Sequence, residues 1–286
     1  QRGDEAIVGQ SWHTYRWEAG GMAVLGSIQP QPVETQPDGT LRIADIAAAI
    51  KPDDPHFART RLVVLENTTG GQVLPPAYIA EVAQLAHSRG LAMHLDGARM
   101  FNAATANAAR NGTDVYDEAR ALCSHFDSAS LCLSKGLGAP VGSLVLGSRD
   151  FIRQARRTRK ILGGGMRQAG VLAAAGHYAL QHHVRRLAED HARLDRLAQG
   201  LADANRSHPV LQGKLTVLPW QTNILFTDLH AEVAPALTAW LAQHGVRVTS
   251  SLYGGATRLR WVTHLDLSEA DVTAALDCVA SFRLPG

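Results

Sequence analysis

The sequence predicts an α/β fold, with a mainly parallel sheet flanked by helices and a small α+β domain at the C-terminal end. A length of 286 residues is enough for two domains. Short apolar runs alternate with amphipathic segments over most of the chain, which is typical of parallel strands joined by crossover helices. The last part of the chain carries a different group of strand and helix patterns. We therefore expect a large domain at residues 1–185 and a small one at 186–286.

The individual elements follow from local patterns. The first expected strand is the apolar run Arg61–Leu65, which lies between charged and polar residues. A helix from Ala77 to Arg89 follows, because Pro75 and Pro76 precede apolar residues at helical spacing and Gly90 ends the run. The other elements expected in the large domain are a strand at 91–96, a helical segment at 102–124, strands at 128–134 and 143–146, and helices over 151–201 with a break at 163–165. In the small domain we expect strands at 223–227, 246–249 and 258–263 and helices at 233–243 and 268–281.

Composition and charge exclude several classes of protein. Hydrophobic residues make up 45% of the chain and charged residues 19%, as in ordinary globular proteins and unlike disordered or fibrous chains. A net charge of +2 is too small to indicate a nucleic-acid partner, and the sequence has no apolar run of about 18 residues for a membrane span. The three cysteines form no Cys-x-x-Cys pair, which favours a reducing, cytoplasmic compartment. The histidines lack metal-site spacing, so we expect no metal.

Polar clusters follow three of the expected strands of the large domain. They are Glu66–Gly71, Asp96–Arg99 and Ser134–Gly138. In open α/β sheets, ligands bind beyond the carboxyl ends of the strands. The sequence therefore predicts one cleft that holds a carboxylate, a guanidinium and an amine.

Lys135 and Asp96 each have two interpretations. Lys135 directly follows an apolar strand and lies next to Gly136, so its ammonium is expected to be partly desolvated, which favours the nucleophilic neutral amine. The alternative is a solvated loop lysine. Asp96 lies two residues after His94, on the same face of its strand, and a buried carboxylate needs a cationic partner. That partner is either the protonated ring nitrogen of a ligand or Arg99.

The segments His94–Arg99 and Ser130–Ser143 resemble the threonine aldolase family. Further matching stretches occur in family order at residues 17–21, 26–30, 65–68, 163–168 and 262–266, so that the resemblance covers nearly the whole chain. The run Leu133–Gly142 is the most specific of these motifs. The resemblance implies the pyridoxal-phosphate (PLP) dependent transferase fold type I, like that of aspartate aminotransferase.

The resemblance also implies roles for individual residues. Lys135 matches the lysine that binds PLP covalently, and Asp96 matches the carboxylate that keeps the pyridine nitrogen protonated. His13 matches the histidine stacked on the pyridine ring, which makes it the second catalytic candidate. Arg99 corresponds to an arginine near the phenolic oxygen and the substrate. Arg260 corresponds to the arginine that binds the substrate carboxylate.

Four further residues are assigned through the same motifs. Ser134 and Arg167 are expected to bind the cofactor, and Lys160 is a basic position near the cofactor phosphate and the substrate. Thr69 stands where the family often has a second histidine, so it is counted as a substrate-binding residue. Because a threonine hydroxyl is a poor base, the base for the substrate's β-hydroxyl stays open between His13, a bound water and the cofactor phosphate.

The implied activity is PLP-dependent retro-aldol cleavage of L-threonine or L-allo-threonine to glycine and acetaldehyde. Two alternatives remain: another PLP-dependent β-eliminating lyase of the same fold, and a truncated, inactive homologue that acts as a binding module. The expected assembly is a homotetramer, a dimer of dimers with shared active sites, with an amino acid as its small-molecule partner and neither nucleic acid nor membrane.

Two departures from the family pattern are visible in the sequence. Nothing matches the family's N-terminal segment with its Gly-Thr phosphate-binding turn, so we expect the large domain to be N-terminally incomplete. The spacing from Asp96 to Lys135 is 39 residues, longer than is usual in the family. We expect the extra length to form a surface extension at residues 107–122.

Overall fold

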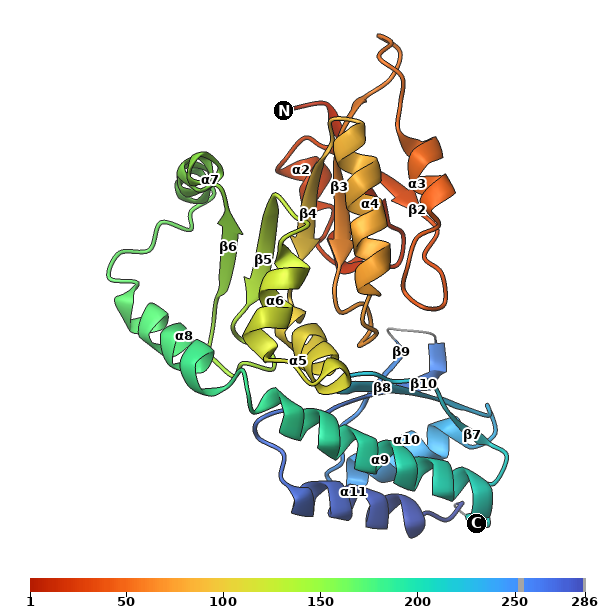
Figure 1. Cartoon of the computed structure of the whole chain (residues 1–286). Helices are drawn as coiled ribbons and strands as arrows, with labels where there is room; N and C mark the ends of the chain where they lie inside the picture. Colours follow the sequence, from red (N-terminus) through yellow and green to blue (C-terminus); the bar gives the residue numbers. More distant parts are fainter. Residues whose placement is uncertain (252–254, 285–286) are drawn as a thin grey trace. The chain divides into compact units, whose positions relative to one another are not determined.

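A computed structural model describes residues 1–251 and 255–284 of the chain. It consists of two compact units, Gln1–Arg185 and Arg186–Gly286, which are described separately (Figure 1).

The first unit is built around a six-stranded sheet with strand order β2-β1-β3-β4-β5-β6. The strands are β1 (Asp4–Gly9), β2 (Gln29–Val33), β3 (Arg59–Glu66), β4 (Ala92–Asp96), β5 (Ser128–Cys132) and β6 (Ser143–Gly147). The helices are α1 (His13–Arg16), α2 (Gly21–Val24), α3 (Ile43–Ala49), α4 (Pro76–Ser88), α5 (Met100–Asn111), α6 (Val115–Cys123), α7 (Arg149–Ile161) and α8 (Gly170–His182). All strand pairs are parallel except β5–β6, which confirms the mainly parallel sheet.

The middle of this sheet is buried on both faces. In β3, the consecutive residues Val63, Val64 and Leu65 are all buried, as expected for a parallel strand that is covered by helices on both sides. Helix α4 buries Ile79, Val82, Ala83 and Ala86, which recur at helical spacing on one side of the helix. Figure 1 shows α4 lying across the strands β3 and β4. This apolar packing fixes the central strands that lead into the site described below.

Residues 107–122 form only part of the surface extension that the sequence predicts. They comprise the end of α5, the connection 112–114 and most of α6; residues 109–113 are exposed, whereas Asn107, Ala108, Val115 and Leu122 are buried. The prediction is wrong for the buried residues, because alanine-rich helices with few large apolar residues can still be covered by neighbouring elements. The side chain of Asp114 accepts a hydrogen bond from the backbone N–H of Tyr116 and caps the start of α6.

Sequence analysis missed β1 and β2, and their composition explains why. Strand β1 begins with Asp4 and Glu5, and β2 contains Pro30 and Pro32. A proline cannot donate to the sheet, so it is found mainly on edge strands. Strand β2 is such an edge, since its only neighbour in the sheet is β1.

The second unit contains an antiparallel four-stranded sheet with strand order β7-β8-β10-β9. Its elements are α9 (Leu187–Ser207), β7 (Leu215–Val217), β8 (Ile224–Leu229), α10 (Ala234–Gln243), β9 (Thr249–Ser251), β10 (Gly255–Val262) and α11 (Glu269–Ala280). Buried side chains from the helices and the sheet form one apolar core, which includes Leu201, Leu237, Trp261 and Phe282.

The predicted strand at residues 246–249 is largely wrong, because β9 begins only at Thr249. The backbone N–H of Val246 instead donates to the carbonyl of Leu241, and Gly245 adopts the left-handed conformation. This is the pattern of a helix C-terminal cap, so the segment after α10 ends the helix before a strand can start. Among the described residues, no helix combines the length and the apolar character needed to cross a membrane.

Gly97 is a position where the sheet requires glycine. A Cβ built on Gly97 would lie 2.5 Å from the carbonyl oxygen of Ser130, and the Gly97 N–H donates to that same oxygen at 3.0 Å. We expect Gly97→Ala to lower the free energy of unfolding by about 1–3 kcal/mol, because β4 and β5 must move apart. Urea denaturation measures this. Gly170→Ala, where a Cβ meets nothing within 4 Å, is the control; an equal loss in both variants would contradict the explanation.

Candidate active site

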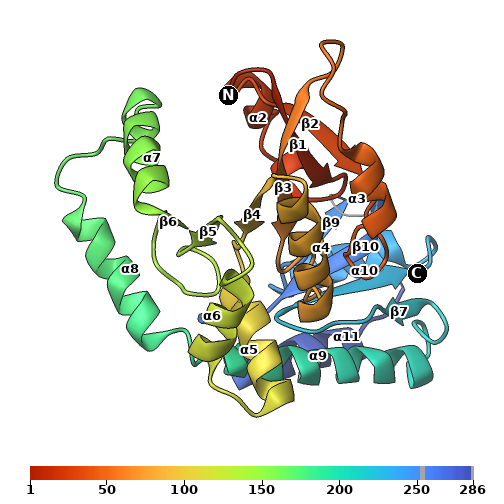
Figure 2. The same ribbon diagram turned by 45° about the horizontal axis from the view of Figure 1, so that its top comes forward.

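Four adjacent parallel strands of the first unit end at the same edge of the sheet. Strands β1, β3, β4 and β5 are neighbours in this order and run in the same direction (Figure 2). The polar residues at or after their carboxyl ends are His13, Glu66, Asp96 and Lys135. This edge of the sheet is the candidate active site, as the positions of the polar clusters in the sequence predict.

Asp96 is the last residue of β4 and pairs in register with Glu66 on one side and Ser130 on the other. Its Oδ1 accepts hydrogen bonds from the backbone N–H of Ala98 at 3.2 Å and from the Ser130 hydroxyl at 3.5 Å. No ion pair joins Asp96 to another described residue, so the interpretation as an ion pair with Arg99 is wrong. The half-buried carboxylate is left to interact with a cationic group of a ligand.

His94 lies on the same face of β4 as Asp96, as the period of two along the strand predicts. Its Nδ1 is 2.8 Å from the Ser128 hydroxyl. Burial lowers the pKa of His94, and the negative charge of Asp96 only partly opposes this shift. The ring is therefore held in its neutral form beside the Asp96 carboxylate.

His13 is held by Glu66 through two contacts. The backbone N–H of His13 donates to Oε2 of Glu66 at 2.6 Å, and Nδ1 of the ring lies 3.0 Å from Oε1. The Glu66 side chain is 4% exposed and that of His13 is 34% exposed. Sequence analysis included Glu66 in a polar cluster but missed this pairing, since 53 residues separate the two partners. A glutamate at the end of a buried strand was the available signal.

Lys135 is exposed in the turn that follows β5, so the expected desolvation of its ammonium is wrong. Leu133 and Leu137 are buried on either side, and their burial turns the lysine between them outward. The side chain of Lys135 has no hydrogen-bond or ion-pair partner within residues 1–251 and 255–284. Ser134 is also exposed, with its hydroxyl 3.5 Å from the Sγ of Cys132. The amine is thus accessible to a ligand at this edge.

Arg99 and Thr69 lie in the segments after β4 and β3. Arg99 is half-buried at the N-terminal cap of α5. Thr69 forms a tight turn with Gln72, in which each backbone N–H donates to the other residue's carbonyl. The loop at Gly39 passes so close that a Cβ there would collide with the Thr69 methyl group.

Two predicted residues of the first unit lie away from this edge. Lys160 is exposed in the last turn of α7, and Arg167 is exposed in the segment after it. Figures 1 and 2 show α7 and α8 beyond the edge strand β6 and not over the middle of the sheet. Arg260 belongs to the second unit, where it is half-buried on β10 and pairs in register with Phe226.

Arg258 lies near Arg260 on β10 and forms a bidentate ion pair with Asp228 on the neighbouring strand β8. Its Nε and Nη2 donate at 2.6 and 2.7 Å, and this hydrogen bonding raises the pKa of the Arg258 guanidinium. Arg258 and Arg260 are two residues apart and lie on the same face of the sheet. The charge of Arg258 is therefore compensated locally by Asp228.

Several buried polar atoms near the candidate site lack a hydrogen-bond partner among the described residues. They are Trp12 Nε1, Thr14 Oγ1, Asn67 Nδ2 and Thr68 Oγ1. All four belong to the segments that follow β1 and β3. A buried donor without a partner costs about 1–3 kcal/mol of stability. A polar ligand that formed hydrogen bonds with these four atoms would remove that cost.

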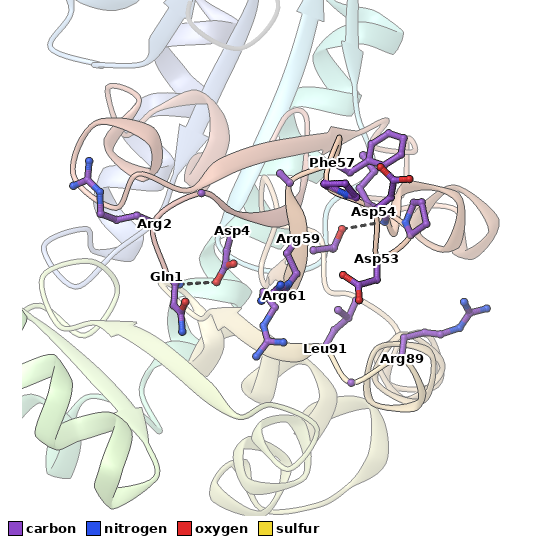
Figure 3. Close-up of a pocket in the computed structure, with 17 residues that line it drawn as sticks. Gln1, Arg2, Asp4, Asp53, Asp54, Phe57, Arg59, Arg61, Arg89 and Leu91 are labelled. Atoms are coloured by element: carbon purple, nitrogen blue, oxygen red, sulfur yellow. Dashed lines mark hydrogen bonds and ion pairs between the residues drawn. The ribbon is translucent and has the colours of Figure 1, made fainter.

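A cavity of about 880 Å³ lies at the opposite, amino-terminal edge of the same sheet (Figure 3). Residues from the starts of β1 and β3 and from the turn before β4 line it, among them Asp4, Arg59 and Leu91. Its arginines Arg59 and Arg61 are exposed and therefore already hydrated. Size alone does not make this cavity the active site, because ligands of parallel α/β sheets bind at the carboxyl ends of the strands.

The fold defines the class of protein: an α/β protein with the mainly parallel, helix-flanked sheet of the fold type I that solved threonine aldolases have. The solved structure of Leishmania major threonine aldolase superimposes with a TM-score of 0.75 at 20% identity, over 98% of this chain and 77% of that one. The family model described as β-eliminating lyase matches residues 1–218.

Curated relatives give the particular family. The low-specificity L-threonine aldolase of Escherichia coli (strain K12) is 47% identical over 268 residues, which are 94% of this chain and 74% of the relative. Low-specificity L-threonine aldolase 1 of Arabidopsis thaliana is 38% identical over 97% of this chain and 75% of the relative. This chain belongs to the β-eliminating lyase family and, within it, to the threonine aldolases, which confirms the resemblance seen in the sequence.

The lowered pKa of His94 predicts how stability depends on pH. The unfolded chain binds a proton at this ring at higher pH than the folded chain does, so the stabilising contribution of neutral His94 is complete above about pH 6.5 and is lost as the pH falls. We expect the difference in unfolding free energy between the protein and His94→Asn to decrease from pH 7.5 to pH 5, measured by urea denaturation. His177→Asn, which replaces an exposed ring, is the control. A constant difference for His94→Asn would refute the prediction.

Proposed function

We propose that this protein cleaves β-hydroxy-α-amino acids, namely L-threonine and L-allo-threonine, into glycine and acetaldehyde with PLP as the cofactor. The observation that carries the proposal is the placement of His13, Asp96 and Lys135 after adjacent parallel strands. The 47% identity to an L-threonine aldolase supports the same reaction.

The residues at the carboxyl edge fit PLP by their chemistry. The exposed amine of Lys135 can bind the cofactor aldehyde, and the Asp96 carboxylate can hold a proton on the pyridine nitrogen. The unpartnered Asn67 Nδ2 and Thr68 Oγ1 are polar groups that ligand oxygens would satisfy. When bound, PLP supplies an electron sink for the charge that forms at Cα of the amino acid.

The protein's own residues then bind and orient the substrate. His13 would offer a flat ring to stack on the cofactor, and Arg99 would serve its phenolic oxygen. Arg260 binds the α-carboxylate, for which a guanidinium provides two parallel N–H donors. Orientation of the carboxylate fixes which bond at Cα is aligned for cleavage.

The remaining assigned residues complete the proposal. Ser134 contacts the cofactor beside Lys135, and Thr69 contacts the substrate. Arg167 and Lys160 act on the phosphate and the substrate in the assembled oligomer. Their exposure beyond β6 is consistent with such a role, since neither side chain is used within the described chain.

We further propose a cytoplasmic homotetramer, a dimer of dimers with shared active sites. The free cysteines support the reducing compartment. Helix α7 has no buried residue, and Ile161, Met166 and Val171 on and after it are 82%, 58% and 69% exposed. Such an apolar surface fits a second copy of the chain. Analytical ultracentrifugation tests this assembly, and a monomer at all concentrations would contradict it.

The proposed function is tested through the covalent bond between PLP and Lys135. The purified protein, incubated with PLP, should turn yellow and release acetaldehyde from threonine. Borohydride reduction followed by peptide mapping should place the label on Lys135, one of only four lysines in the chain. Lys135→Ala should lose colour and turnover, whereas Lys214→Ala, which removes a surface ion pair with Glu232, should keep both. A label on another lysine would overturn the assignment.

The name of the matching family model favours β-elimination as a second candidate function. An aldolase releases glycine and an aldehyde, whereas a β-eliminating lyase releases ammonia and a keto acid. Assays of all four products with threonine and serine distinguish the two, and the four stereoisomers of threonine give the stereopreference. If the protein binds neither PLP nor substrate, the proposed cleavage is wrong and the inactive homologue is the alternative to pursue.

Arg260→Lys keeps the positive charge but removes the paired donors. We expect KM for threonine to increase about 10- to 100-fold with a smaller change in kcat, because charge-assisted hydrogen bonds to the carboxylate are lost. Steady-state kinetics measure both constants. Arg247→Lys, outside the strands of the same unit, is the control. An unchanged KM for Arg260→Lys would contradict the carboxylate-binding role.

A further inference from the structure

We propose that Glu66 is a positioning residue that fixes the tautomer of His13, so that Nε2 of His13 is the base for the substrate's β-hydroxyl. The inference deepens the proposed aldolase function and rests on it. It selects His13 from the three candidate bases that the sequence leaves open, the others being a bound water and the cofactor phosphate.

The buried carboxylate of Glu66 is used entirely by His13. Among the described residues, Oε2 accepts the His13 backbone N–H at 2.6 Å and Oε1 faces Nδ1 at 3.0 Å. No lysine or arginine lies within ion-pair distance of this 4%-exposed side chain in the described part of the chain. His13 is therefore the group that supplies the hydrogen-bond donors for the Glu66 carboxylate.

This geometry determines where the ring carries its proton. The 2.6 Å contact is short for an N–H···O bond, as in bonds to an ionised carboxylate. A carboxylate oxygen offers only lone pairs to Nδ1, so Nδ1 must carry the hydrogen. In the neutral ring, Nε2 then has a free lone pair.

The position of His13 makes this lone pair useful. The ring is 34% exposed, so it can reach a ligand, while the partner that orients it is buried. Glu66 is also in register with Asp96 on the adjacent strand, which places the pair next to the carboxylate assigned to the cofactor. A base whose other nitrogen is held by a carboxylate is a recurring catalytic arrangement.

The proposed step moves the proton of the β-hydroxyl to His13. The O–H bond of the β-hydroxyl breaks and its proton bonds to Nε2 of His13. The electron pair of that bond forms the C=O of the departing acetaldehyde as the Cα–Cβ bond breaks. The electron pair of the Cα–Cβ bond stays with the glycine fragment until Cα takes up one proton. One proton leaves oxygen and one joins carbon, so none is consumed.

Glu66→Gln is the informative variant. Its amide oxygen can still accept the His13 backbone N–H, but its NH₂ group then points at Nδ1 and donates to it. The ring hydrogen should move to Nε2, and the lone pair that acts as base is lost. We expect kcat for threonine cleavage to fall about 10²- to 10⁴-fold with KM changed less than about threefold. Glu5→Gln is the control, since Glu5 is a buried carboxylate on β1 that is bound by Thr60 and Gln29 and paired with Lys51.

A second readout does not depend on activity. ¹⁵N NMR of the cofactor-free protein, labelled at histidine and recorded at alkaline pH, distinguishes a protonated ring nitrogen from an unprotonated one. His13→Asn identifies the relevant signals among the thirteen histidines. We expect the hydrogen on Nδ1 in the protein and in Glu5→Gln, and on Nε2 in Glu66→Gln.

The results separate this inference from the proposed function. A hydrogen on Nε2 of His13 in the unmodified protein overturns the inference even if Glu66→Gln fails to fold. An unchanged kcat in Glu66→Gln also overturns the inference, as does a loss of kcat in Glu5→Gln that equals the loss in Glu66→Gln. If the tautomers are as expected but the PLP-loaded protein does not cleave threonine, the proposed function fails and the role of Glu66 as the partner of His13 stands.

Discussion

The candidate site depends on the common direction of four adjacent strands. Because β1, β3, β4 and β5 are parallel, the residues that follow them meet at one edge of the sheet. Two backbone hydrogen bonds of 3.0 Å continue the pairing beyond the strands, from Asn67 N–H to the carbonyl of Asp96 and from Gly97 N–H to the carbonyl of Ser130. The second bond needs the space that Gly97 leaves. These constraints place groups from distant parts of the sequence at one site.

Two carboxylates in register on neighbouring strands have different surroundings and therefore different uses. Glu66 is almost fully buried, and His13 occupies both of its oxygens. Asp96 is half-buried and, among the described residues, accepts hydrogen bonds from the Ala98 N–H and the Ser130 hydroxyl. Different environments for two nearby acids are a common way to give them separate roles. Glu66 acts within the protein, while Asp96 is available to a ligand.

The cationic groups are held in contrasting ways. Lys135 is exposed in a turn between the buried Leu133 and Leu137. The two leucines fix the backbone of the turn, while the amine of Lys135 stays accessible. Arg258 donates two hydrogen bonds to the carboxylate of Asp228, which compensates its charge. Arg260 lies two residues further along the same strand.

The sequence by itself determined the parallel sheet, the positions of β3, β4 and β5, and the motifs around Asp96 and Lys135, because these rest on periodicity and on residues close together in the chain. It could not reveal that Lys135 is exposed, that Asn107, Val115 and Leu122 are buried, or that the segment after Gly245 caps a helix. The tertiary structure alone decided these points, since burial depends on what packs against a segment. The pairing of His13 with Glu66 is of the same kind: 53 residues separate the partners, and only the parallel alignment of β1 with β3 brings them together.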